Sequence, residues 1–322
     1  MTVVVVSTGG TIASTESEGG DAEPELTGDA LVAAVPGLNS VADVRTHDFS
    51  NVPSPYFTVE QMHELAEVVR SYDEDDEVSG VVVTQGTDIL EESAYFVDCC
   101  YGGDTPVVFT GAMRNPSLAG ADGPANLLAS VRAASDERFR ETSQNTAVVF
   151  DDRLHAPADV TKMHSSNVDT FRSPEFGPLA TIDEDRVVWR HHPAEPTPTF
   201  DVDPDRLTND VVAAFATADM TDAVIRAAAD SAAFCLAATG AGHVPPGIIP
   251  ALESLRDGDV PIVATTRCPE GRLARETYGF RGSEATLREL GCYYSDQNLQ
   301  KTRVRTIVAH AADAFDEAFE RP

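Results

Sequence analysis

The stretch VVVVSTGGTIA, residues 3–13, places a run of branched apolar residues directly before two glycines and a threonine. A second stretch with the same layout, GVVVTQGTD, occupies residues 80–88. Neither apolar run shows the apolar–polar alternation of a half-exposed strand, which is typical of parallel strands covered by helices on both faces. Similar runs lie at residues 107–110 and 146–150. We therefore predict a mostly parallel β-sheet in the first half of the chain.

Helical patterns fill the segments between these predicted strands. The sequence TVEQ at residues 58–61 is a capping box, and apolar residues at helical spacing follow it to Tyr72. Asp88 and Glu91 have the same spacing and predict the start of a second helix, and a third is expected from about residue 124 to 134. Strands that alternate with helices predict a doubly wound α/β fold.

A proline-rich segment divides the chain of 322 residues. Its prolines are Pro193, Pro196, Pro198 and Pro204. Because such a segment cannot continue a helix or a central strand, we expect a linker at residues 193–208. It would separate an N-terminal catalytic α/β domain, residues 1–192, from a smaller C-terminal α/β domain, residues 209–322. In the latter we predict strands at 211–216, 232–238 and 261–265, and helices at 224–229, 248–255 and 299–319.

The chain is strongly acidic, with 53 Asp and Glu against 23 Lys and Arg, so its net charge is −30. This charge argues against a nucleic-acid partner and against an anionic membrane surface. No apolar stretch approaches the roughly 20 residues that span a bilayer, and the first residues lack the basic region of a signal peptide. We therefore expect a cytoplasmic protein.

Lysine is almost absent, since Lys162 and Lys301 are the only two in the sequence. An acid-rich, lysine-poor composition is expected of a protein kept in concentrated salt. Repulsion among the acidic side chains is long-ranged in dilute buffer, but at about 1 M salt the Debye length is only about 3 Å. We predict a halophilic protein, with an ordinary acidic protein as the alternative.

The cysteines and histidines show no spacing typical of a metal site. The five cysteines are Cys99, Cys100, Cys235, Cys268 and Cys292, with no CxxC pair among them, and the histidines form no HxxxH or HExxH motif. We interpret all five cysteines as reduced thiols and predict no metal ion.

Both glycine-containing loops follow the carboxyl end of a predicted parallel strand, where ligands bind in open α/β sheets. Each loop presents a threonine hydroxyl, at Thr11 and Thr87. A phosphate-binding loop is the competing interpretation, but the first loop matches neither GxGxxG nor GxxxxGK[ST]. Nucleotide binding is therefore disfavoured.

A threonine hydroxyl becomes a useful nucleophile only when a base removes its proton. Lys162 is the candidate base, because an amine can accept a proton when partial burial disfavours its charged form. Asp88 could orient that amine, in the manner of a hydroxyl–base–carboxylate triad. The alternatives remain open at this point: Asp88 as a helix N-cap, Thr11 and Thr87 as turn residues, and Lys162 as a surface charge.

Several motifs together resemble the bacterial-type L-asparaginase family. They are TGGTIA at residues 8–13, TQGTD at 84–88 with EESAYF at 91–96, GAMR at 111–114, ADGPANL at 121–127 and DVTK at 159–162. They occur in the family's order. The resemblance covers nearly the whole chain, and it is strong through about residue 180 and looser after the linker. The segment EGGDAEP at residues 18–24 is similar to the lid of the cytosolic branch.

The resemblance implies that the chain hydrolyses the side-chain amide of L-asparagine without a cofactor. Thr11 would attack the amide carbon, and Thr87, Lys162 and Asp88 would form the second catalytic group. Ser54 would hold the α-carboxylate of the substrate. Thr87 and Asp88 would also contact the substrate, Asp88 through its α-ammonium group. Since the family builds its site between subunits, a homodimer or homotetramer is implied.

The sequence departs from the family pattern at several positions. Residues 15–27 contain no tyrosine, although many members carry one on the lid, and Pro55 stands where periplasmic members usually have a glutamine. Glu276 and Glu284 are the two candidates for the acid that a neighbouring subunit supplies.

The motifs and the candidate residues leave three functions open. The first is an L-asparaginase with possible glutaminase side activity, because one methylene is discriminated by only about 1–3 kcal/mol. The second is an ammonia-supplying tRNA-amidotransferase subunit, which has an extra domain ahead of the first motif; we expect none here because the motif begins at Thr8. The third is a non-catalytic amino-acid sensor, which would not need two hydroxyls and a base.

Overall fold

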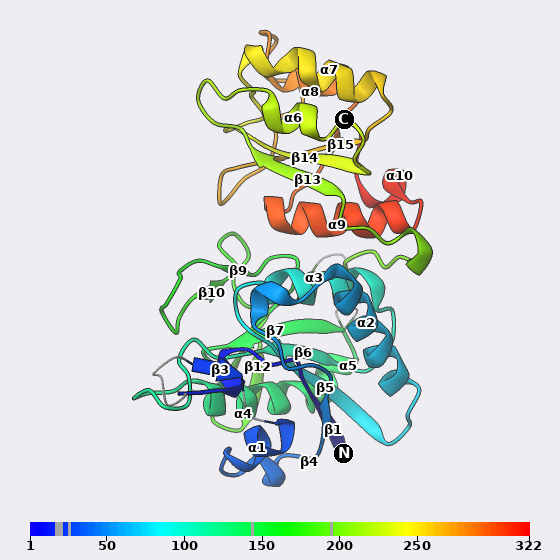
Figure 1. Ribbon diagram of the computed structural model, residues 1–322. Coiled ribbons are helices and arrows are strands. Elements are labelled where there is room, and N and C mark those ends of the chain that lie inside the picture. Colours follow the sequence, from blue (N-terminus) through cyan, green and yellow to red (C-terminus); the bar gives the residue numbers. More distant parts are fainter. Residues whose placement is uncertain (17–21, 25–26, 143–144, 194–195) are drawn as a thin grey trace. The chain divides into compact units, whose positions relative to one another are not determined.

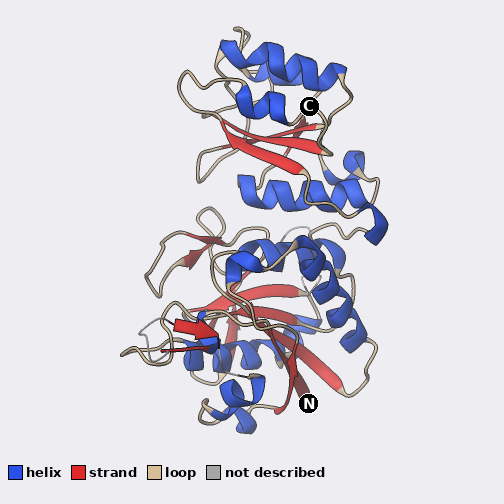
Figure 2. Ribbon diagram, in the orientation of Figure 1, coloured by secondary structure: helices blue, strands red, loops and turns tan. Residues whose placement is uncertain are grey.

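A computed structural model describes residues 1–16, 22–24, 27–142, 145–193 and 196–322. The chain forms two compact units, residues 1–199 and residues 200–322, and each is described by itself. Both are α/β units built on a mostly parallel sheet, which confirms the predicted fold class (Figures 1 and 2).

The described part of the first unit holds an eight-stranded sheet in the order β12-β11-β8-β7-β6-β5-β1-β4. Five neighbouring strands are parallel: β4 (Asp43–Asp48), β1 (Thr2–Ser7), β5 (Val78–Thr84), β6 (Val107–Thr110) and β7 (Thr146–Phe150). The predicted strands among them are confirmed. The sequence patterns missed the antiparallel extension, which consists of β8 (Arg153–His155), β11 (Ala180–Asp183) and β12 (Arg186–Trp189).

Helices cover both faces of this sheet (Figure 1). On one face lie α1 (Gly28–Ala33), α4 (Gly123–Ala134) and α5 (Glu137–Arg140), and on the other α2 (Val59–Asp73) and α3 (Leu90–Cys100). The predicted capping box opens α2. The strand that follows β1 in the sheet, β4, lies on one side of it, and the later strand β5 lies on the other side. The order in which strands are added therefore reverses at β1, and the carboxyl ends of β1 and β5 flank the resulting crevice.

Two small antiparallel pairs lie outside the main sheet. The hairpin of β9 (Thr161–Lys162) and β10 (Phe171–Arg172) places Phe171 opposite Lys162. The buried ring of Phe171 packs on Phe150 at a centroid distance of 4.3 Å, which anchors the hairpin to the end of β7. The second pair is β2 (Ser14–Glu16) with β3 (Ala22–Pro24). The predicted lid overlaps this pair, but its residues 18–21 lie outside the described residues.

The second unit has a four-stranded parallel sheet in the order β13-β14-β15-β16. Its strands are β13 (Val211–Phe215), β14 (Ala233–Ala238), β15 (Ile262–Thr266) and β16 (Tyr293–Tyr294). Its helices are α6 (Ala223–Ala227), α7 (Ile249–Asp257), α8 (Glu284–Glu289), α9 (Leu299–Ala311) and α10 (Phe315–Ala318). Helix α9 covers one face of the sheet and α7 the other (Figure 1).

One predicted helix, at residues 299–319, is wrong as a single element. Helix α9 ends at Ala311, and α10 begins at Phe315. Between them Asp313 has a φ of +55°, a left-handed conformation that interrupts a helix and that aspartate tolerates better than most residues.

Short 3-10 turns complete the described elements. They are η1 (Thr11–Ala13), η2 (Leu38–Ser40), η3 (Ser54–Tyr56), η4 (Pro204–Arg206) and η5 (Pro246–Ile248). All five cysteines are thiols rather than disulfides. Over the described ranges no helix has the length and apolar character needed to cross a membrane.

Candidate active site

Three loops pack closely together at the carboxyl ends of β1, β4 and β5. Gly10 has a φ of +86°, and a Cβ atom built on it would lie 2.3 Å from Cα of Gly86. A Cβ atom on Gly86 would in turn lie 2.5 Å from Cβ of Ser54. A side chain at either glycine would therefore push the loops apart. The residues next to these glycines, Thr11 and Thr87, are brought to the same place.

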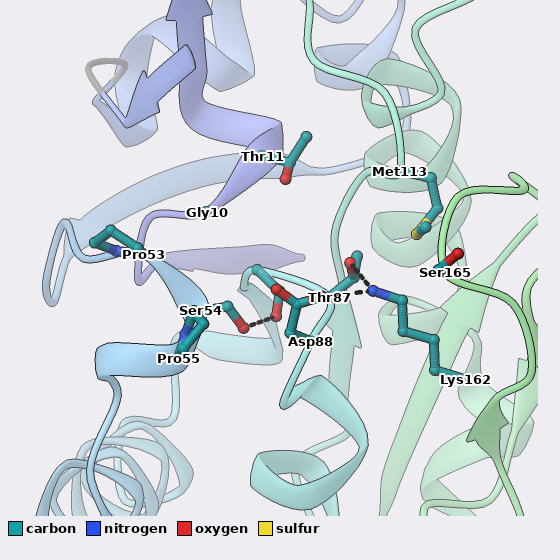
Figure 3. Close-up of a pocket in the computed structure, with 11 residues that line it drawn as sticks. Gly10, Thr11, Pro53, Ser54, Pro55, Thr87, Asp88, Met113, Lys162 and Ser165 are labelled. Atoms are coloured by element: carbon teal, nitrogen blue, oxygen red, sulfur yellow. Dashed lines mark hydrogen bonds and ion pairs between the residues drawn. The ribbon is translucent and has the colours of Figure 1, made fainter. Parts of the chain in front are cut away.

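The loops enclose a pocket of about 260 Å³. It is lined by Gly10, Thr11, Pro53, Ser54, Pro55, Gly86, Thr87, Asp88, Met113, Lys162 and Ser165 (Figure 3). All five residues proposed from the sequence for catalysis or binding are in this lining: Thr11, Ser54, Thr87, Asp88 and Lys162. They come from four separate parts of the chain.

Lys162 connects the hairpin to the loop after β5. Its Nζ donates hydrogen bonds to Oγ1 of Thr87 at 2.8 Å and to Oδ1 of Asp88 at 2.7 Å. The Lys162 side chain is 15% exposed, whereas that of Asp88 is 62% exposed. The amine is thus withdrawn from solvent beside a hydroxyl, and the carboxylate that orients it is open to a ligand.

The alternative that Asp88 caps a helix is wrong. Helix α3 begins at Leu90, its N-cap residue is Ile89, and no side chain caps it. Oγ of Ser54 instead accepts a hydrogen bond from the Ile89 N–H at 3.2 Å. Asp88 is therefore available for Lys162.

Thr11 lies across the pocket from Lys162, on the turn η1, with its hydroxyl directed toward the pocket (Figure 3). The buried Ser54 hydroxyl lies between the loops and donates to the Gly86 carbonyl at 2.7 Å. A serine hydroxyl has one donor, so Ser54 must rotate away from Gly86 before it can donate to a ligand carboxylate.

The wall of the pocket at Met113 is fixed by the carboxylate of Asp122. This carboxylate accepts hydrogen bonds from the backbone N–H groups of Met113, at 3.0 and 3.1 Å, and of Arg114, at 2.9 Å. Asn126 donates to Asp122 at 3.1 Å and to the Gly111 carbonyl at 3.0 Å. The motif at residues 121–127 thus supports the motif at 111–114.

Met113 and Ser165 are among the lining residues that were not predicted as site residues. Met113 follows the carboxyl end of β6, so its position after a parallel strand could have identified it. Ser165 follows the short hairpin strand β9 in an irregular segment, and no pattern in the sequence distinguishes it.

The two candidates for an acid supplied to a neighbouring chain differ in exposure. The Glu284 carboxylate is fully buried and accepts hydrogen bonds from the backbone N–H groups of Thr277, at 2.8 Å, and of Tyr278. Burial opposes ionisation, but these donors lower the pKa of Glu284 below its usual value. Glu284 is thus buried and held within its own unit, whereas Glu276 is exposed. No group of three or more His, Cys, Asp or Glu in the described chain is arranged to hold a metal ion.

The pocket lies at the carboxyl ends of the strands, where the strand order of the doubly wound sheet reverses, and it holds a hydroxyl, an amine and a carboxylate. This arrangement is typical of α/β enzymes. Residues 2–195 match the family described as "Asparaginase, N-terminal", and residues 210–321 match the "Glutaminase/Asparaginase C-terminal domain". The chain belongs to the asparaginase family and is an amidohydrolase.

Curated relatives align along most of the chain. A probable L-asparaginase of Deinococcus radiodurans is 34% identical over 99% of this chain and 96% of its own length. A glutaminase-asparaginase of Pseudomonas aeruginosa is 31% identical over 84% of this chain and 76% of its own length. A glutamyl-tRNA(Gln) amidotransferase subunit from Methanothermobacter thermautotrophicus is 31% identical over 86% of this chain and 65% of its own length.

Proposed function

We propose that this protein is an L-asparaginase that hydrolyses L-asparagine to L-aspartate and ammonia. One observation carries the proposal: Nζ of Lys162 lies 2.8 Å from the Thr87 hydroxyl and 2.7 Å from Asp88, in the pocket that Thr11 enters from the other side. This is the grouping that activation of a hydroxyl requires. The names of the relatives support the same amide chemistry.

In the proposed reaction, the Thr11 hydroxyl gives up its proton as its Oγ1 forms a bond to the amide carbon of the substrate side chain. The C–N bond breaks, the leaving nitrogen takes up a proton and departs as ammonia, and a β-aspartyl ester remains. Water then hydrolyses the ester and releases Thr11. Lys162, held by Asp88, moves protons through the Thr87 hydroxyl. Backbone N–H groups near Thr11 and Thr87 would stabilise the oxyanion, at about 3 kcal/mol per donor.

Substrate recognition follows from the charges around the pocket. The exposed Asp88 carboxylate suits the α-ammonium group of an amino acid, and Ser54 and Thr87 suit the remaining polar groups. Pro55 offers no side-chain hydrogen bond to the ammonium group. Glutamine is longer by one methylene, so we expect measurable glutaminase side activity.

The second candidate is an ammonia-supplying subunit, and the amidotransferase relative favours it. Such a subunit would need a partner to use the ammonia, whereas an asparaginase turns over free asparagine alone. The amino-acid sensor remains the third candidate, and any turnover argues against it.

We further infer a cytoplasmic, halophilic homodimer or homotetramer of the cytosolic-like branch. The halophilic character is inferred from the net charge of −30 and from the presence of only two lysines, a composition suited to a protein kept in concentrated salt. The oligomer is inferred from the family resemblance.

The decisive experiment measures ammonia release from asparagine and from glutamine, side by side, in multimolar salt. We expect turnover of asparagine by the isolated chain and its loss in Thr11→Ala and in Thr87→Ala. Undiminished turnover in either variant would remove that threonine from its proposed role, and no turnover by the unmodified chain would overturn the asparaginase proposal.

A further inference from the structure

A buried carboxylate holds the main chain of Lys162 from the side opposite the hairpin. Glu91 lies in the first turn of α3 and is only 4% exposed. Its Oε2 accepts a hydrogen bond from the backbone N–H of Lys162 at 2.7 Å. A bond from an N–H to a carboxylate is roughly twice as strong as one between neutral groups.

The direction of the Lys162 N–H explains why the hairpin does not satisfy it. The next N–H, that of Met163, donates to the Thr170 carbonyl across the hairpin at 2.8 Å. Successive N–H groups along a strand point to opposite edges, so the N–H of Lys162 points away from β10. It therefore lies on the outer edge of a strand only two residues long, and Glu91 occupies that edge.

Helix α3 begins two residues after Asp88, so one short segment, residues 87–91, supplies the hydrogen-bond partners of both the amine and the main-chain N–H of Lys162. Thr87 and Asp88 bind its Nζ, and Glu91 binds its main chain. A lysine side chain has four rotatable bonds, and the position of its amine depends on where the backbone is held. A shift of the backbone would lengthen the contact between Nζ and Oγ1 of Thr87.

We propose that Glu91 is a positioning residue, whose hydrogen bond to the Lys162 N–H sets the distance between the Lys162 amine and the Thr87 hydroxyl. The role rests on the proposed amide hydrolysis. Glu91 acts through Lys162 and is not itself among the residues that line the pocket.

The competing explanation is that Glu91 only stabilises the fold. Asp73 provides a matched control in the same unit, because it too is a carboxylate that accepts backbone hydrogen bonds. It binds the N–H groups of Thr105 at 2.8 Å and Asp104 at 3.1 Å, and the Tyr101 hydroxyl at 3.0 Å. None of these residues lines the pocket.

The test compares Glu91→Leu, Glu91→Gln and Asp73→Leu at equal concentrations of folded protein. We expect Glu91→Leu to lower kcat about 10- to 100-fold, since a misplacement of about 1 Å can cost a factor of 10². KM should change by less than about threefold, because Ser54 and Asp88 are untouched. Glu91→Gln keeps an acceptor oxygen and should recover most of kcat, while Asp73→Leu should affect stability alone.

A second measurement does not depend on catalysis. Hydrogen–deuterium exchange should show a protected amide at Lys162 in the unmodified protein, and exchange at least about tenfold faster in Glu91→Leu but not in Asp73→Leu. If Glu91→Leu does not fold, Glu91→Asp, with its carboxylate withdrawn by one methylene, takes its place and should lower kcat and speed exchange at Lys162 to a smaller extent.

The outcomes separate this inference from the proposed function. If the unmodified protein releases no ammonia, the proposed function fails, and exchange at Lys162 still decides whether Glu91 holds the lysine. Unchanged exchange at Lys162 in the Glu91 variant would overturn the inference. So would a kcat within threefold of the unmodified protein, or a loss equal to that of Asp73→Leu.

Discussion

Both sheets of this protein lead their parallel strands into threonines: β5 of the first unit is followed by Thr87, and β15 of the second ends at Thr266. In the second unit the threonine hydroxyls are used internally. Thr266 donates to the Gly240 carbonyl at 2.7 Å, and Thr239 to the His243 carbonyl at 2.9 Å. In the first unit, Thr87 instead receives a hydrogen bond from the Lys162 amine at the edge of a pocket. A hydroxyl after a parallel strand thus becomes a candidate for chemistry only when a base reaches it.

The largest expected effect comes from removing the Lys162 amine, which we propose as the base. Lys162→Met keeps most of the side-chain volume and deletes the amine, and we expect kcat for asparagine to fall about 10²–10⁴-fold, the usual contribution of a positioned acid–base group. Ammonia release in multimolar salt measures it, with Thr266→Ala as the control that leaves the first unit intact. An unchanged kcat in Lys162→Met would show that the amine beside Thr87 does not distinguish this threonine from Thr266 of the second unit.

Salt should act on both regions, because the acidic residues occur along the whole chain. On dialysis from multimolar to about 0.1 M salt the Debye length grows from less than 3 Å to about 10 Å, and repulsion increases. We expect loss of activity, measured by ammonia release, and dissociation of the proposed oligomer, measured by sedimentation. Full stability and activity in dilute buffer would contradict the halophilic interpretation.

Acid should weaken the first unit through His155. Burial lowers the pKa of His155 to about 4 from an ordinary value of 6.5, and its Nδ1 contacts the Ser173 hydroxyl at 2.9 Å. Between pH 6.5 and pH 4 the unfolded chain takes up a proton that the folded one does not. The free energy of unfolding therefore falls as the pH is lowered, by up to about 3 kcal/mol at about 1.4 kcal/mol per pKa unit.

Chemical denaturation at pH 7 and at pH 4 would measure this loss, in the unmodified protein and in His155→Asn, which keeps a polar group near Ser173. The variant should lose less stability with acid. In the second unit, burial lowers the pKa of the partly buried His310 as well, and we expect a smaller effect there from His310→Asn. If acid lowers the free energy of unfolding equally in the unmodified protein and in His155→Asn, His155 is not the group responsible for the acid sensitivity.

The smallest effect is expected in the second unit, from Thr266→Ala. The change removes the hydrogen bond to the Gly240 carbonyl and one from the Cys268 N–H at 3.1 Å. We expect a loss of about 1–2 kcal/mol in the free energy of unfolding, with kcat unchanged. Thermal unfolding and the ammonia assay test both statements, and a large fall in kcat at constant stability would show that this threonine, too, serves catalysis.

Sequence patterns were most informative where burial and loop chemistry agree. The strands before Thr11 and Thr87 are covered on both faces, so their unbroken apolar runs were diagnostic, and strand ends in a parallel sheet predicted that the two loops meet. The antiparallel strands β8, β11 and β12 are only three or four residues long, too short for a clear period. The spacing of Asp88 and Glu91 is that of a capping box, but both carboxylates instead accept hydrogen bonds from Lys162.

The contact between Gly10 and Gly86 has a practical consequence for engineering. Because the main chain at Gly86 leaves no room for a side chain at Gly10, the distance between the two threonine-bearing loops is set by the backbone. Saturation libraries should find these two glycines among the least tolerant positions of the chain. Attempts to retune the preference between short and long amides would do better to vary Met113 and Ser165, which line the pocket on the side away from Gly10 (Figure 3).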